Sequence, residues 1–223
     1  MVWPDSWRDR QRAARGRASL WLLAGIAVAS VSRAGAAPLA DGVVVSVEER
    51  AVMWSEMLAY AATWGQLPSL LAPAPPRTVD DLAELMVRRL IALVTAEELG
   101  LTSQDENAVQ QQLDRVTQGR GPDFLEAVER RTSVSRSELR ALAREEASIG
   151  RILAQRFRYL TQVAGQDASA AAESSGDGTQ KELREALDKA IDEWLTVERQ
   201  HAIVRIELPA GVQGSTPLSA LME

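Results

Sequence analysis

His201 is the single histidine of the chain, and it is the first candidate for a general base or a metal ligand. A catalytic base needs a nucleophile or an orienting acid beside it, and a metal site needs further ligands. The neighbours Gln200 and Ala202 supply neither. We therefore interpret His201 as a half-exposed residue at the end of a helix.

Pairs of adjacent carboxylates such as Asp80–Asp81, Glu97–Glu98 and Glu145–Glu146 could in principle exchange protons with a substrate. Each pair lies in a predicted helix or at its start and has polar neighbours. A solvated helix face is the ordinary place for such pairs. Their positions therefore predict no acid–base site.

The short motifs with which enzymes hold phosphates, nucleophiles or zinc do not occur in this sequence. There is no Walker A sequence, no G-x-G-x-x-G, no G-x-S-x-G and no H-E-x-x-H. The absence of cysteine excludes disulfides, thiolate nucleophiles and cysteine-bound zinc. The sequence thus predicts no catalytic residue, no cofactor, no metal ligand and no small-molecule substrate, so an enzyme is not expected.

Methionine, aromatic and leucine side chains gather in the stretch 53–71. Such side chains on an adaptable surface suit the binding of varied apolar partners. The alternative is that they pack on the helix that follows Thr78, as apolar residues ordinarily do. The candidate client-binding residues are Met53, Trp54, Met57, Tyr60, Trp64, Leu67, Leu70 and Leu71.

The composition favours helices. Hydrophobic residues make up 46% and charged residues 25%, but aromatic residues only 4%, and strands draw on aromatic residues. The net charge is −6, and it is −10 without residues 1–36, which carry six arginines and two aspartates. An acidic surface repels phosphate backbones, so nucleic acid is not an expected partner.

The first 36 residues have the order of a secretory signal peptide. A basic stretch (8–17) precedes an apolar run (20–31), and Ala34-Gly35-Ala36 follows as a small-x-small cleavage signature. The alternative is a retained transmembrane anchor, which needs about 20 apolar residues, and this run is shorter. We expect cleavage after Ala36 and a mature protein in the periplasm that is not embedded in the membrane.

The remaining sequence predicts a mainly α fold with a strand near each end. Because a lone strand leaves its backbone groups unpaired, we expect the first strand to pair with the last. Helix starts are predicted at Thr78 or Asp80 and at two capping boxes, 103–106 and 135–138. The expected order is strand 43–47, a helix from Val52 towards Gly65, a proline-rich loop 65–77, helices from 78, 103, 122 and 135, a helix bearing Leu183 to Leu195, and strand 203–208. As domains, we expect 37–163 to be helical, 164–180 to be a flexible linker, 181–208 to complete the same domain and 209–223 to be a loose tail.

The order of these segments resembles the N-terminal chaperone domain of the SurA family of periplasmic peptidyl-prolyl isomerases. The similar segments are 41–53, 85–91 leading to 97–101, 102–106 and 138–152, so the resemblance covers about residues 41–160. Family members usually carry parvulin isomerase domains of about 90 residues before the closing helix. Here that place holds only the segment 164–180.

The resemblance implies a chaperone core without the isomerase. We expect a non-enzymatic periplasmic chaperone-like protein that binds unfolded or envelope-bound polypeptides. One alternative is a dedicated interaction subunit of an envelope or secretion assembly. A second is a peptidyl-prolyl isomerase, which rests on the family label alone.

Overall fold

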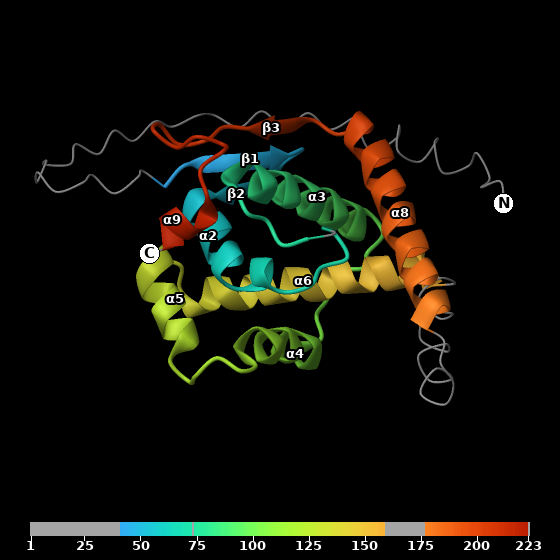
Figure 1. Cartoon of the computed structure of the whole chain (residues 1–223), viewed down its shortest axis with the longest axis horizontal. Helices are drawn as coiled ribbons and strands as arrows, with labels where there is room; N and C mark the ends of the chain where they lie inside the picture. The colour runs from blue at the N-terminus through green and yellow to red at the C-terminus, as the bar shows by residue number, and fades with distance from the viewer. Residues whose placement is uncertain (1–40, 73, 159–176, 223) are drawn as a thin grey trace, which may run out of the picture. The chain divides into compact units, whose positions relative to one another are not determined.

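The computed structural model describes residues 41–72, 74–158 and 177–222, so the expected signal peptide and its cleavage site lie outside the described residues (Figure 1). This part of the chain is mainly α, as predicted. Its helices are α2 (Trp54–Ala62), α3 (Val79–Glu98), α4 (Glu106–Thr117), α5 (Phe124–Thr132), α6 (Arg136–Arg156), α8 (Asp177–His201) and α9 (Leu218–Met222), and a short 3-10 helix, η1 (Trp64–Gln66), follows α2. The strands are β1 (Val43–Val47), β2 (Arg50–Met53) and β3 (Val204–Ile206).

The three strands form one antiparallel sheet in the order β2-β1-β3. Val45 lies opposite Ile206 and Val47 lies opposite Val204, which confirms the expected pairing of the first strand with the last. Strand β2 was not expected, because a helix was predicted to begin at Val52. That prediction is wrong: Glu48 adopts a left-handed turn, and the chain folds back so that Val52 pairs with Val45.

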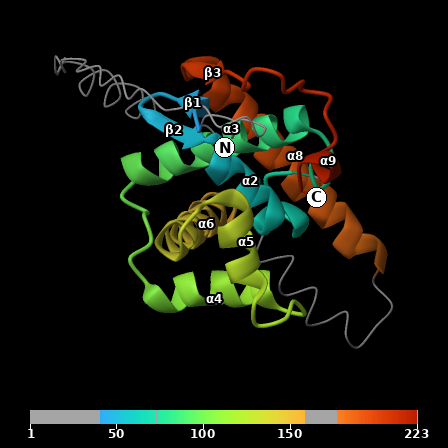
Figure 2. The same cartoon turned by 90° about the vertical axis from the view of Figure 1, so that its left-hand side faces the viewer.

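The elements stack in layers, which both views show (Figures 1 and 2). The sheet lies on α3, α3 lies on α6, and α6 lies on α4. Helix α8 packs along α3 with a stripe of four buried side chains: Leu187, Ile191, Trp194 and Leu195. The tryptophan ring meets Phe157, just after α6, edge-on at 6.0 Å between ring centroids. The segments before and after residues 159–176 therefore share one core.

Local capping sets where two of the long helices begin. The Thr78 hydroxyl accepts the Asp81 N–H and the Asp81 carboxylate accepts the Thr78 N–H, so Thr78 rather than Asp80 caps α3. Ser135 and Glu138 form the same reciprocal pair at the start of α6, as predicted.

Helix α4 departs from the prediction, because Asp105 caps it and not Ser103. The Ser103 N–H donates instead to the Ser148 hydroxyl on α6, and this buried bond ties the loop before α4 to α6.

The linker and the tail are more ordered than expected where the structure describes them. Helix α8 already begins at Asp177, so the last residues of the expected linker 164–180 are helical, while 164–176 lie outside the described residues. The tail 209–223 was expected to be loose, and this is corrected. Asp80 and Val79 donate their N–H groups to the carbonyls of Gly214 and Thr216, and Leu218 is buried. The first N–H groups of a helix lack acceptors within the helix. The carbonyl groups of the tail are the acceptors for these N–H groups of α3.

Candidate functional site

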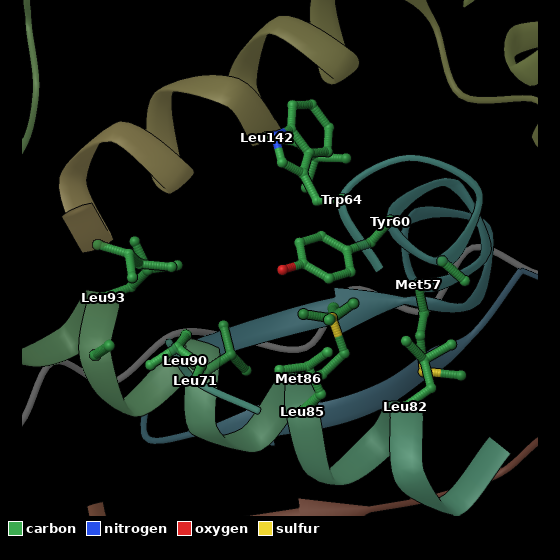
Figure 3. Close-up of a cluster of buried hydrophobic side chains, with 14 of the residues drawn as sticks. Met57, Tyr60, Trp64, Leu71, Leu82, Leu85, Met86, Leu90, Leu93 and Leu142 are labelled. Carbon is green, nitrogen blue, oxygen red and sulfur yellow. The ribbon is translucent and has the colours of Figure 1, made fainter. Parts of the chain in front are cut away.

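The eight candidate client-binding residues lie mainly in the core. Five of them are at most 4% exposed: Trp54, Met57, Tyr60, Trp64 and Leu71. The other three, Met53, Leu67 and Leu70, are half-buried. These residues therefore do not form one exposed surface, and the packing alternative describes most of them. Figure 3 shows Met57, Tyr60 and Leu71 against the leucine and methionine side chains of α3.

Burial follows from the position of α2, which contacts α3, α5 and α9. A helix that is apolar on all sides belongs in a core. The sequence indicated the burial of α2, because Ala59, Ala61 and Ala62 lie on the faces between its large side chains. All three alanines are buried.

A surface cavity of about 250 Å³ remains at one end of this stretch, beneath the loop that joins η1 to α3. Trp64 and Leu67, two of the eight candidates, line it. Leu85 of α3 and Arg184 of α8 also border it. The remaining lining residues are Gly65, Gln66, Pro68, Ser69, Ala72, Ala74, Pro75 and Pro76.

Trp64 lines this cavity, but its indole nitrogen does not open into it. The Nε1–H is buried, with almost no accessible surface, and has no hydrogen-bond acceptor within the described residues. Nearly all buried polar groups in folded proteins have a partner, so this N–H is an exception inside the core, and the recognition properties of the cavity come from its other groups. Arg184 is exposed and forms no ion pair with another described residue.

The size and chemistry of the cavity limit what it can hold. Pockets for drug-sized ligands and cofactors occupy roughly 300–1,000 Å³, so this cavity is smaller than such a site. Its wall is mainly proline, alanine, leucine and tryptophan, with one charged residue among the described lining. It fits an apolar side chain of another polypeptide.

A charge cluster centred on the buried Arg89 lies on the other side of Tyr60, and this cluster we define as Arg50, Arg89, Glu97, Glu145 and Glu146; Glu97, at its margin, is exposed. The side chain of Arg89 is 1% exposed and donates to Glu146 at 2.8 Å and to Glu145 at 2.6 Å. Its guanidinium also lies 4.9 Å from the centre of the Tyr60 ring. Arg50 joins Glu145 at 3.1 Å and is also paired with Glu97. The cluster ties α3, α6 and β2 together.

This arrangement corrects the expectation that Glu145 and Glu146 lie on a solvated face. Their side chains are 26% and 14% exposed and both are ion-paired. The other two pairs, Asp80–Asp81 and Glu97–Glu98, are exposed as expected. The sequence did hold a signal, because Arg89 lies among Leu85, Met86 and Leu93 on the apolar stripe of its helix, and a buried arginine requires acidic partners.

Burial shifts the titration of several groups in and beside the cluster. It raises the pKa of Glu146 above its ordinary value, although the charge of Arg89 acts in the opposite direction. It likewise raises the pKa of Glu56, and the nearby charge of Glu145 adds to that shift. Hydrogen bonds from Arg50 lower the pKa of Glu97. The carboxylates of the cluster are ion-paired with arginine, and none of them lines the cavity.

His201 is exposed at the end of α8, where its Nδ1–H donates to the Val197 carbonyl at 2.7 Å. Among the residues that the structure describes, no three histidine or acidic side chains come close enough to hold a metal ion. No helix in the described ranges has the length and apolar character needed to span a membrane.

No model of a known protein family matches the chain, and no curated protein matches its sequence.

Proposed function

We propose that this chain is a non-enzymatic, chaperone-like protein of the periplasm that binds unfolded or envelope-bound polypeptides. In this proposal the cavity beneath the loop 64–76 receives an apolar side chain of the bound polypeptide. The observation that carries the proposal is the cavity itself, with its mainly apolar wall.

The loop over the cavity favours recognition through side chains. Pro68, Pro75 and Pro76 have no N–H group, so this stretch of backbone is poorly suited to pair with a partner strand. An unfolded polypeptide instead offers apolar side chains, and one of these matches the mainly apolar wall of the cavity. Folded proteins bury most of their large apolar side chains, which favours unfolded partners.

A binding role without catalysis is supported by where the ionisable side chains lie. Glu145 and Glu146 are engaged by Arg89, and neither lines the cavity. The resemblance to the SurA family supports a chaperone core. The segment 164–180 is much shorter than the roughly 90 residues of an isomerase domain. The periplasmic location rests on the basic, apolar and small-residue order of residues 1–36.

A dedicated interaction subunit of an envelope or secretion assembly is the second candidate. The observation that favours it is the small size of the cavity, which fits one anchoring side chain of one partner better than a long groove would. Promiscuity separates the two: a chaperone protects several unrelated unfolded proteins from aggregation, while a subunit protects none of them and binds one partner.

Filling the cavity should remove this activity. Ala72 is half-buried in the cavity wall, so Ala72→Phe places a ring where the partner's side chain would lie. We expect the affinity for an unfolded polypeptide to fall at least about tenfold, which corresponds to about 1.4 kcal/mol. The measurement is the concentration of mature protein that halves the aggregation of a diluted, urea-unfolded protein.

Ala141→Phe is the matched control, because Ala141 is exposed on α6 and away from the cavity. Ala141→Phe should prevent the aggregation of the unfolded protein at the same concentration as the parent chain. Both variants should melt cooperatively. An Ala72→Phe protein that is folded and still protects fully would show that the cavity is not the binding site.

A further inference from the structure

Strand β3 forms an edge of the sheet, and no other strand among the described residues covers it (Figure 1). The hydrogen bonds to β1 show which of its backbone groups are free. Glu48 donates its N–H to the Ile203 carbonyl at 3.0 Å, and Glu207 donates its N–H to the Val44 carbonyl at 2.8 Å. Antiparallel ladders use alternate residues. The backbone groups of Val204 and Ile206 therefore point away from β1, towards the open edge.

Apolar side chains are exposed at the same place. Few large apolar side chains of the described residues are substantially exposed, and two of them lie here: Ile203 at 63% and Ile206 at 42%. An open strand edge with apolar neighbours is a template for pairing with another chain.

We propose that this edge pairs with the same edge of a second copy of the chain, antiparallel and in the register centred on Ile206. In that register Ile206 lies opposite Ile206 of the second copy, and Val204 lies opposite Leu208 of the second copy. In this register the residues whose backbone groups point away from β1 lie opposite each other. Their N–H and C=O groups can therefore form the hydrogen bonds between the two copies.

Charge complementarity favours this register, and it favours a second copy of the chain as the partner strand. With Ile206 at the centre, Arg205 lies opposite Glu207 of the second copy, and the two-fold symmetry repeats the pair. Opposite charges across strands stabilise pairing, and like charges directly opposite destabilise it. The register centred on Arg205 would place two arginines opposite each other. The sequence Val204-Arg205-Ile206-Glu207-Leu208 is therefore complementary to itself, which favours a second copy over an unrelated strand.

Two substitutions test the pairing without removing β3 from the sheet. Ile206→Pro deletes an outward N–H that β1 does not use, and proline is tolerated at such an edge position. Glu207→Arg places like charges opposite each other in the proposed register. Analytical ultracentrifugation of the mature chain should show a concentration-dependent dimer, and each variant should raise its dissociation constant at least tenfold.

The charge-swapped chain Arg205→Glu/Glu207→Arg should restore the dimer, because it restores both opposite-charge pairs. Glu49→Arg is the matched control for charge and should dimerise like the parent, since Glu49 lies in the turn between β1 and β2. Circular dichroism establishes whether each variant is folded. If Ile206→Pro does not fold, the charge-swapped chain still tests whether β3 pairs with a second copy. A monomeric parent chain at all concentrations, a dimer unaffected by Glu207→Arg, or a swap that fails to restore it would overturn the proposal.

Discussion

Truncation of the chain to residues 37–165 is expected to leave it unfolded or aggregated, although that piece contains nearly all of the resemblance to the chaperone family. The truncation removes α8, β3 and the tail. It exposes the faces of α3 and β1 that they cover, and it removes the tail carbonyls that accept the first N–H groups of α3.

The lost burial explains the size of the effect. Five large side chains are at most 7% exposed in the segment removed: Leu187, Ile191, Trp194, Leu195 and Leu218. Each contributes about 1.5–3 kcal/mol when buried, so their joint loss is comparable to a domain's whole stability of roughly 5–15 kcal/mol. Ile206 adds little to this loss, because it is 42% exposed.

Thermal melting followed by circular dichroism is the measurement. The matched control is the full mature chain cut once by a protease site placed within residues 164–176. That cut removes no described residue, so the two pieces should stay associated and melt cooperatively. If the truncated chain melted cooperatively near the temperature of the full chain, α8 and β3 would be an independent appendage and not part of the core.

Replacement of the buried arginine is expected to have the largest effect of any single substitution. Arg89→Leu leaves Glu146 buried without its cation. Breaking a buried ion pair in this way costs about 3–5 kcal/mol. Urea unfolding at about pH 7 should show this loss in the free energy of unfolding. Arg140→Leu is the matched control on an exposed ion pair, with Glu106, and should change the free energy of unfolding little, because solvent screens that pair.

The pH dependence distinguishes an uncompensated charge from lost packing. Burial already raises the pKa of Glu146, and loss of Arg89 removes the charge that opposes this shift, so the pKa rises further. A carboxyl group whose pKa is higher in the folded state than in the unfolded state stabilises the fold below its unfolded pKa, and this stability is lost as pH rises through the folded pKa. The deficit of Arg89→Leu should therefore shrink as the pH is lowered towards the ordinary pKa of glutamate.

Arg89→Leu/Glu146→Gln provides the second arm of the same experiment. It should recover part of the loss at about pH 7 and should lack that pH dependence, because no carboxylate is left opposite residue 89. If the single and double variants were equally unstable at every pH, the cost would come from packing, and the electrostatic account of the cluster would be contradicted.

Features that depend on neighbouring residues could be predicted from the sequence. The capping pair at Ser135 joins residues three positions apart and was predicted, and Thr78 was one of the two predicted caps of α3. The capping box predicted at 103–106 was wrong, because Ser103 bonds to Ser148 in a distant helix. The pairing of the first and last strands was also predictable. Each run is too short to stand alone, and the backbone groups of each need a partner.

The features that were missed depend on contacts between distant residues. Strand β2 exists because Val52 meets Val45 across a turn, and the tail is ordered because Gly214 reaches Asp80. The burial of Glu146 depends on Arg89 in another helix. The candidate site shows the same limit. Trp64 and Leu67 were recognised by type, but only the fold shows that these two line the cavity and that Met57 and Tyr60 do not.

The central claim is that an unfolded polypeptide binds at the cavity, and site-specific cross-linking tests it most directly. Ala74 is exposed on the cavity wall, so a photoreactive phenylalanine analogue at position 74 would lie within reach of a bound polypeptide. The same analogue at the exposed position 141 on α6 is the control. We predict cross-links to a urea-unfolded protein from position 74, few from position 141, and loss of the former when Ala72→Phe is added. Equal cross-linking from both positions, or cross-linking at 74 that survives Ala72→Phe in a folded chain, would contradict the account.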